Sequence, residues 1–233
     1  MDALILAAGK GTRLGLNDSP KCLIEFGTSS LIEYQIKCLN ELGIKNIHII
    51  TGYFPEKIKS KIGDLANYIH NPEFSSTNNI CSILCAKNFM SDDFICIYGD
   101  LFFDKKILKN CFSSKKDIVL TVEKNLREET SRVKIKDDKI ILVNKNINFN
   151  EADGNFIGMA KFSKQILPKF FDAISNIMKN NMDSYYTSAI ELLIQNGESV
   201  HYVSTNNLQW MDIDEPNEFE DAKIIFKQIG DES

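Results

Sequence analysis

Residues 3–15 read ALILAAGKGTRLG, and this stretch decides how the rest of the chain is interpreted. The run from Ala3 to Ala8 has the length and apolar composition of a buried strand, and Gly9-Lys10-Gly11 ends it. In open α/β sheets, ligands bind beyond the carboxyl ends of the strands, where such turns lie. We therefore expect this turn to lie at the edge of a sheet where a small molecule binds.

Two further apolar runs, 46–51 and 94–98, follow the first, and helix signals separate them. Ser30 and Glu33 have the spacing of a capping box, and the helix that they begin is expected to stop before Gly43. Continuous apolar strands joined by helices are typical of parallel sheets that are covered on both faces. The first half predicts a doubly wound, mostly parallel, Rossmann-like α/β sheet.

The pattern changes between residues 117 and 162, where short strand-like runs follow one another with turns between them. We interpret this stretch as a β-rich flap over the edge of the sheet where the small molecule is expected to bind. Helix-like segments return at 164–179 and 185–195, and a last helix is expected after Pro216. Because no linker or repeat divides the chain, residues 1–233 are predicted to form a single domain.

The composition excludes several classes of protein. Lys and Arg number 27 against 32 Asp and Glu, giving a formal net charge of −5, whereas a general nucleic-acid-binding protein needs a basic face. Met1-Asp2 offers no basic leader, no apolar run is long enough to span a bilayer, and the six cysteines contain no C-x-x-C pair. We expect a cytoplasmic protein with free thiols that binds neither nucleic acid nor membrane.

The glycine turn has the chemistry of a phosphate site. Glycines let backbone N–H groups approach an anion, Arg13 can bind two phosphate oxygens at once, and Lys21 supplies a further positive charge. The third glycine, Gly15, comes one residue too late for the dinucleotide motif, and no G-K-[ST] completes a P-loop. A basic surface turn without a ligand is the alternative.

Three aspartates are candidate ligands for Mg²⁺. Asp100 directly follows the third long strand, so it is expected to face the glycine turn. Asp212 and Asp214 are two residues apart, which puts both on one side of an extended segment. Mg²⁺ is usually held by one or two carboxylates together with substrate phosphates. For Asp214, the cap of the following helix remains an equal alternative.

Several of these motifs together resemble the nucleotidyltransferases of the nucleoside-diphosphate-sugar pyrophosphorylase type. They are residues 4–14, Pro20-Lys21, 31–35, 98–100 and 210–214. Within that superfamily, residues 71–82 and 154–162 look like the small cytidylyltransferases, whose acceptors include phosphocholine, 2-aminoethylphosphonate and phosphoglutamine. The resemblance therefore implies that CTP and a small phosphorylated acceptor are the partners, with Mg²⁺ as cofactor.

The resemblance also implies roles for individual residues. Lys21 and Arg13 are the expected catalytic residues, and Asp100, Asp212 and Asp214 the expected metal ligands. The residues expected to bind the nucleotide are Leu6, Ala7, Ala8, Gly9, Lys10, Gly11, Thr12, Asn71, Asn78, Ser82 and Gly99. Those expected to bind the acceptor are Arg132, Lys134, Lys145, Glu151, Asn155, Lys161 and Tyr185.

The predicted reaction is the transfer of CMP from CTP to a phosphate monoester or phosphonate. The acceptor oxygen is already anionic at neutral pH, so none of the three histidines is needed as a general base. A phosphoglutamine-like acceptor is favoured over phosphocholine. The alternatives are a sugar-1-phosphate uridylyl- or thymidylyltransferase, a non-catalytic nucleotide-sensing module and an NAD-dependent dehydrogenase. The sequence leaves the oligomeric state open.

Overall fold

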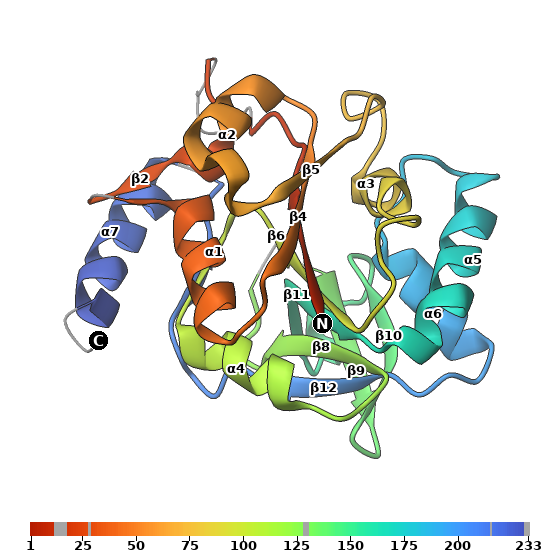
Figure 1. Cartoon of the computed structure of the whole chain (residues 1–233). Coiled ribbons are helices and arrows are strands. Elements are labelled where there is room, and N and C mark those ends of the chain that lie inside the picture. The colour runs from red at the N-terminus through yellow and green to blue at the C-terminus, as the bar shows by residue number, and fades with distance from the viewer. Residues whose placement is uncertain (12–17, 28, 128–130, 215, 231–233) are drawn as a thin grey trace.

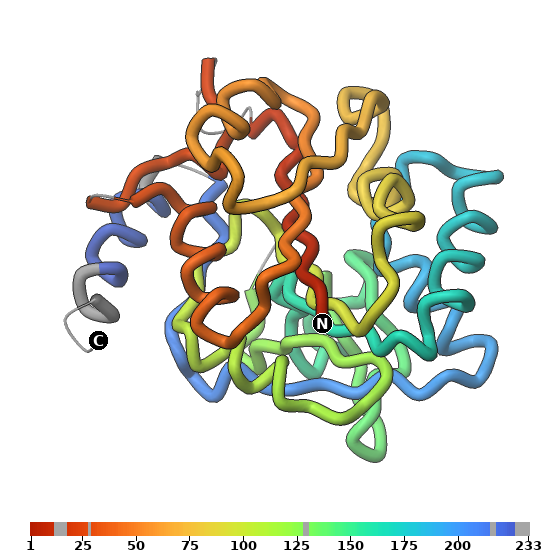
Figure 2. Tube along the Cα trace, viewed as in Figure 1, coloured from red at the N-terminus to blue at the C-terminus, as the bar shows by residue number. Residues whose placement is uncertain are grey.

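A computed structural model places residues 1–11, 18–27, 29–127, 131–214 and 216–230. A nine-stranded sheet forms its centre, in the order β10-β9-β11-β6-β1-β4-β5, with β8 and β12 paired beside β11 (Figure 1). Helices cover both faces of this sheet. The tube in Figure 2 shows the N-terminus beside the central strands and the C-terminal helix at the outer side of the molecule.

The parallel half of the sheet contains the three strands that the sequence predicts. β1 (Asp2–Ala7) lies between β4 (Asn46–Thr51) and β6 (Phe94–Tyr98), and both pairs are parallel. β5 (Asn67–His70), which we did not predict, adds a fourth parallel strand beyond β4. All four carboxyl ends therefore meet at one edge, and the doubly wound α/β prediction is confirmed.

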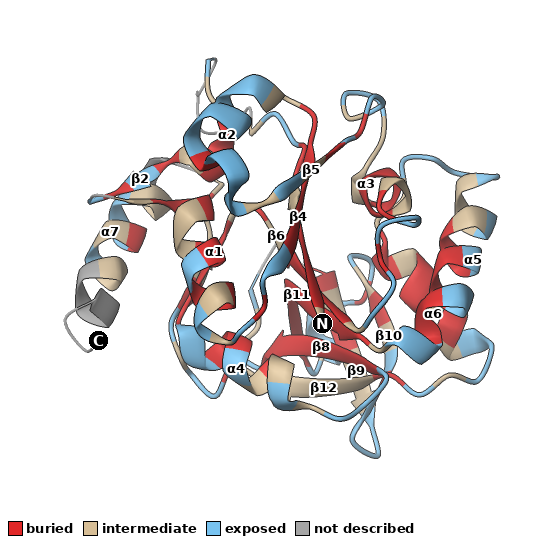
Figure 3. Ribbon diagram, in the orientation of Figure 1, coloured by how far each residue is buried: buried red, intermediate tan, exposed pale blue. Residues whose placement is uncertain are grey.

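Side chains of β1 alternate between two hydrophobic cores. Ala3, Ile5 and Ala7 face the core under one helical layer, whereas Leu4 and Leu6 face the other. The first layer contains α1 (Leu31–Glu41), α2 (Pro55–Ile62) and α4 (Lys105–Ser113), and the second contains α3 (Asn79–Cys85), α5 (Leu167–Met178) and α6 (Thr187–Gln195). Burial on both faces explains why the central strands are almost continuously apolar (Figure 3).

The start and stop signals of α1 act as predicted. The Glu33 carboxylate accepts hydrogen bonds from both the backbone N–H and the hydroxyl of Ser30, each at 2.7 Å. At the other end, Gly43 has φ +80°, a conformation that a residue with a side chain rarely adopts. Local chemistry therefore fixes both ends of the helix that connects β1 to β4.

The segment predicted as a flap is instead part of the main sheet. β11 (Gly154–Phe162) is buried along its whole length and pairs antiparallel with β6, β8 and β9. The other strands of this half are β8 (Ile118–Glu123), β9 (Ser131–Lys136), β10 (Lys139–Asn144) and β12 (His201–Ser204). The predicted strands are present and line the pocket described below, but they extend the main sheet because the apolar β11 pairs with β6.

A short ribbon outside the main sheet carries the end of the chain back toward β6. β7 (Leu101–Phe103) pairs antiparallel with β13 (Trp210–Asp212), and the N–H of Ile213 donates to the Asp100 carbonyl at 3.1 Å. α7 (Pro216–Gly230) and the hairpin of β2 (Glu25–Phe26) and β3 (Ser29–Ser30) pack over it. The ribbon thereby places Asp212 beside Asp100.

Two sequence-based expectations concern the chain as a whole. Across the described residues, no helix combines the length and apolar character that crossing a membrane requires. All six cysteines are free; Cys85 is partly exposed and the other five are buried. Burial raises the pKa of the Cys22 thiol to about 12, so this thiol is neutral beside the ligand pocket described below.

Candidate active site

Two adjoining cavities lie at the carboxyl ends of β1 and β6. They measure about 320 and about 250 Å³, and they share Leu6, Gly9, Asp100 and Asp214 in their walls. The strand ends approach closely here, since the Gly99 N–H donates to the Leu6 carbonyl at 2.9 Å. A Cβ on Gly99 would lie 2.8 Å from that oxygen, so only glycine fits.

Lys21 lies between two of the predicted carboxylates. Its ammonium donates to Oδ2 of Asp100 at 2.8 Å and also to the Asp214 carboxylate, and its side chain is only 10% exposed. Burial alone would lower the pKa of Lys21, but the two carboxylates outweigh it and raise that pKa. The lysine is therefore fully charged at neutral pH.

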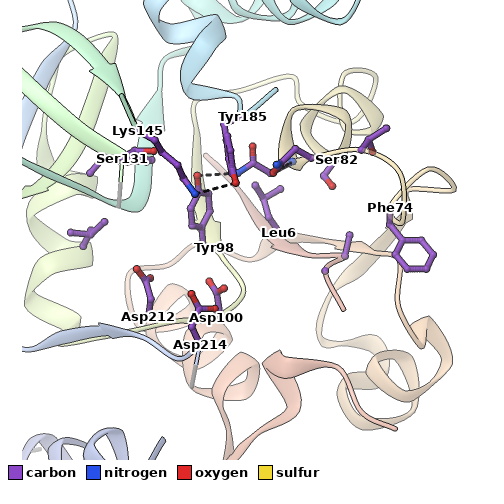
Figure 4. A pocket seen from close by; sticks show the side chains of 17 residues that line it. Leu6, Phe74, Ser82, Tyr98, Asp100, Ser131, Lys145, Tyr185, Asp212 and Asp214 are labelled. Carbon is purple, nitrogen blue, oxygen red and sulfur yellow. Dashed lines mark hydrogen bonds between the residues drawn. The ribbon is translucent and has the colours of Figure 1, made fainter. Parts of the chain in front are cut away.

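Asp212 completes the cluster of carboxylates (Figure 4). Burial, followed by repulsion from Asp100 and Asp214, holds the pKa of its carboxyl well above the usual range, although Lys21 and Arg127 act in the opposite direction. Its buried Oδ1 has no hydrogen-bond partner among the described residues. Such an oxygen beside two further carboxylates fits a cation, so the donor set suits Mg²⁺.

The carboxylates are not already arranged as a metal cage. Within the placed parts of the chain, no three His, Cys, Asp or Glu side chains form a group that could hold a metal ion. Instead, the Lys21 ammonium lies between Asp100 and Asp214. A divalent cation would therefore have to replace the ammonium at one or both carboxylates.

The glycine turn packs directly on Lys21. Gly11 has φ +61°, and a Cβ there would lie 2.9 Å from Cβ of Lys21. The Lys10 ammonium lies 6.0 Å from the centre of the Phe74 ring. Thr12 and Arg13 lie outside the described residues. The turn thus supplies Gly9 and Gly11 to the cavity next to Lys21.

Apart from Asn71, the predicted nucleotide residues of the described chain lie at the start of α3 and at the ends of β1 and β6. Asn78 and Ser82 line the larger cavity, together with Leu6, Ala8 and Gly9, while Ala7, Gly11 and Gly99 line the smaller one. Asn71 is 1% exposed and donates from Nδ2 to the Ser82 hydroxyl at 3.1 Å. Asn71 therefore supports Ser82 from behind and does not line either cavity.

Lys145 and Tyr185 form the wall opposite the carboxylates. The Lys145 ammonium lies 3.0 Å from the Tyr185 hydroxyl and 4.3 Å from the centre of its ring. Burial would raise the pKa of Tyr185, but hydrogen bonds with Lys145 and Asn78 lower it. In Figure 4 this pair and the three aspartates lie on either side of Tyr98. The pocket thus has a cationic wall facing an anionic one.

The other predicted acceptor residues lie outside both cavities. Arg132 donates to the Ile147 carbonyl at 2.9 Å, and Lys134 pairs with Glu151 at the surface. Asn155 is fully buried and donates to the Asn125 carbonyl at 2.9 Å. Lys161 donates to the Ser114 carbonyl after α4 and lines a separate cavity at the opposite edge of the sheet. Each of these side chains has a partner that holds the fold.

The structure adds pocket residues that sequence reasoning missed. They are Phe74, Thr77, Asn79, Tyr98, Ser131, Phe156 and Ile157. Tyr98 and Asn79 stood next to predicted residues, so their position in the motifs was a usable signal. Phe156 and Ile157 lie within the 154–162 stretch that carries the family resemblance, but Ser131 carried no signal, because only the pairing of β9 with β11 brings it to the pocket.

A family model matches the part of the chain that holds the glycine turn, Lys21 and Asp100. The model of the MobA-like NTP transferase domain matches residues 3–168, more than half of the chain. The chain belongs to this family. A MobA-like NTP transferase is a nucleotidyltransferase, and the match supports that enzyme class over a dehydrogenase.

This MobA-like domain is also similar to individual proteins, by sequence and by fold. The CTP:phosphoglutamine cytidylyltransferase of Campylobacter jejuni is 28% identical over 243 residues, which cover 92% of this chain and 96% of that protein. The choline-phosphate cytidylyltransferase of Streptococcus pneumoniae is 36% identical over 115 residues, or 47% of this chain and 49% of that protein. The inositol-1-phosphate CTP transferase of T. maritima has the same fold, with a TM-score of 0.83 at 21% identity, over 98% of this chain and 95% of that one.

Proposed function

We propose that this MobA-like domain is a cytidylyltransferase that transfers CMP from CTP to a small phosphate monoester or phosphonate and releases pyrophosphate. One observation carries the proposal: a buried lysine and three aspartates converge at the strand ends, and a cationic wall faces them across the same pocket. Two relatives whose names state cytidylyl transfer support the choice of nucleotide.

The charges of the pocket suit the joining of two anions. An anionic oxygen of the acceptor attacks the α-phosphorus of CTP, a new P–O bond forms, and the bond to the β-phosphate breaks so that pyrophosphate leaves. Lys21 neutralises the developing charge at the α-phosphate, while the fixed dipoles of the glycine turn face the departing phosphates. Because the nucleophile is already ionised, positioning and electrostatics supply the catalysis.

Mg²⁺ is the proposed cofactor. Asp100, Asp212 and Asp214 would hold it, since carboxylate oxygens are its preferred protein ligands and one of them lacks a partner in the described structure. When bound, Mg²⁺ supplies positive charge to the phosphate oxygens. Once CTP is present, Lys21 gains a phosphate partner in place of the carboxylates.

The acceptor wall favours a head group that carries an anion. Lys145 lies over the ring of Tyr185, so a protein cation already occupies the aromatic face that a quaternary ammonium would need. Its ammonium is available to a carboxylate or a second phosphate oxygen. This charge supports a phosphoglutamine-like acceptor over phosphocholine, in agreement with the name of the Campylobacter jejuni relative, whose match covers 92% of this chain.

The test is pyrophosphate release from a matrix of nucleotides and acceptors. CTP, UTP and dTTP are each combined with phosphoglutamine, phosphocholine, 2-aminoethylphosphonate and glucose-1-phosphate, with and without Mg²⁺. We expect release with CTP, greatest with phosphoglutamine and dependent on Mg²⁺.

Turnover of UTP or dTTP with the sugar phosphate would overturn the cytidylyl assignment in favour of a sugar nucleotidyltransferase. Binding of CTP without turnover of any acceptor would instead favour the nucleotide-sensing alternative. Mass spectrometry of the product identifies the CDP-linked compound directly.

A further inference from the structure

Glu123 is a buried carboxylate that lies outside the pocket, at the last position of β8. It is 5% exposed, yet hydrogen bonds lower its pKa in spite of the burial that opposes them, so it is ionised. A buried charge is costly unless donors surround it. Here the backbone N–H of Asn125 donates at 2.8 Å, and two side chains from the far end of the chain donate as well.

One of these donors precedes β13, the strand that carries Asp212, and the other is the first residue of β13. The Thr205 hydroxyl donates to Oε2 of Glu123 at 2.8 Å, and the indole N–H of Trp210 donates to the same oxygen at 3.1 Å. Thr205 and Trp210 are 0% and 2% exposed. One oxygen at the end of a main-sheet strand therefore holds both ends of the segment that leads into β13.

The Glu123 contact links β13 to the main sheet. Among the described strands it pairs with β7 alone, and that ribbon is separate from the nine-stranded sheet. Trp210 and Asp212 are two residues apart on the same strand, so their side chains project on the same side. A displacement of the indole would move the Asp212 carboxylate with it.

We propose that Glu123 is a positioning residue of the active site, which fixes Asp212 through the indole of Trp210. The inference rests on the proposed function for its ligand, the metal complex of CTP. Partners that orient a metal ligand from behind typically change metal affinity by 10- to 100-fold when they are removed. Glu123 acts in this way although it touches neither cavity.

The single tryptophan of the chain makes the contact measurable. Glu123→Leu removes the acceptor, Thr205→Val removes one donor at nearly constant volume, and Glu123→Gln keeps an oxygen that accepts from the indole. Glu191→Leu is the control, because Glu191 is a half-buried carboxylate that accepts from Asn144 and Val143, away from β13.

Tryptophan emission and the affinity for Mn²⁺·CTP are measured for each protein, together with the affinity for CTP in EDTA. In Glu123→Leu we expect a red-shifted, more readily quenched emission and about tenfold weaker binding of Mn²⁺·CTP, with metal-free CTP binding unchanged. Thr205→Val should show smaller changes in the same direction. Glu123→Gln and the control should resemble the unmodified protein.

Unchanged emission and Mn²⁺·CTP affinity in both Glu123→Leu and Thr205→Val would overturn the proposal, and so would an equal loss of CTP binding with and without metal. If Glu123→Leu does not fold, Thr205→Val decides. Failure of the unmodified protein to bind Mn²⁺·CTP would refute the proposed function. In that event the emission spectra still decide whether Glu123 holds Trp210.

Discussion

The Lys21 ammonium lies 2.8 Å from Oδ2 of Asp100, although 79 positions separate the two residues in the chain. Lys21 comes from the segment after the glycine turn, and Asp100 follows β6. The parallel pairing of β1 and β6 brings the two together, because both strands end at the same edge. This ion pair therefore depends on the pairing of β1 with β6. The apolar runs that predict both strands thus also predict that the two charges meet.

Lys21→Met should lower kcat by about two to three orders of magnitude, since it removes the fixed charge at the α-phosphate. Pyrophosphate release at saturating CTP measures the effect, and circular dichroism checks the fold. Lys61→Met is the matched control, because Lys61 is an exposed lysine of α2 that pairs with Glu25 and Glu33. Near-normal turnover in Lys21→Met would remove this lysine from the mechanism.

Asp100→Asn should abolish the metal-dependent turnover while the protein stays folded. The amide keeps the shape of the side chain but loses the charge that attracts Mg²⁺. EDTA should inactivate the unmodified enzyme, and added Mg²⁺ or Mn²⁺ should restore it but not the variant. An unmodified enzyme that keeps full activity in EDTA would contradict the proposed cofactor.

Lys145→Met should raise the KM for the acceptor and leave the KM for CTP nearly unchanged, because Lys145 lines the wall opposite the carboxylates. Lys134→Met changes the same residue type at a position paired with Glu151 outside both cavities. Steady-state kinetics with each substrate varied in turn separates the two effects. Equal KM values for the acceptor in Lys145→Met and Lys134→Met would show that the acceptor binds elsewhere.

Gly158→Ala should destabilise the protein more than Gly197→Ala does. Both glycines have φ +89°, so the backbone strain is matched, at roughly 1–2 kcal/mol for a residue with a side chain. Around Gly197 a Cβ meets nothing within 4 Å, whereas at Gly158 it would lie 2.4 Å from the Tyr98 ring. Urea unfolding of both variants measures the difference. Equal losses would show that Tyr98 moves aside at no cost.

His48→Leu should make the stability of the protein less sensitive to mild acid. Burial lowers the pKa of His48 below its ordinary 6.5, although Asp2 opposes this, and neither ring nitrogen has a partner among the described residues. The unfolded chain therefore binds a proton that the folded one rejects, and stability falls as the pH drops below about 6.5. Urea unfolding at pH 7.5 and 5.5 measures the free energy of unfolding. Between these two pH values it should fall less for the variant than for the unmodified protein.

The elements that follow from local signals are those that the sequence predicts well. The apolar runs at β1, β4 and β6 and the Ser30–Glu33 capping box are visible within a few residues. The cluster of Lys21 with Asp100, Asp212 and Asp214 was also predictable, because strand ends and an i, i+2 spacing restrict where these charges lie. Their roles in metal binding and catalysis stay predictions that the experiments above address.

Long-range pairing accounts for what the sequence could not reveal. Whether the strands after residue 117 cover the sheet or extend it depends on the pairing of β11 with β6, which no local pattern encodes. The same pairing buries Asn155 and Lys161 against backbone carbonyls, although a polar residue in a strand also fits an exposed site. Ser131 and Phe156 reach the pocket for the same non-local reason.

Asp212 and Asp214 come from β13 and the residues just after it, beyond the 3–168 stretch that holds Lys21 and Asp100. During translation, the parallel strands can therefore leave the ribosome and assemble while two of the four charged groups are still missing. A nascent chain that stops before β13 would carry the parallel strands with an incomplete carboxylate cluster. The carboxylate cluster is thus completed only after the parallel strands have been synthesised.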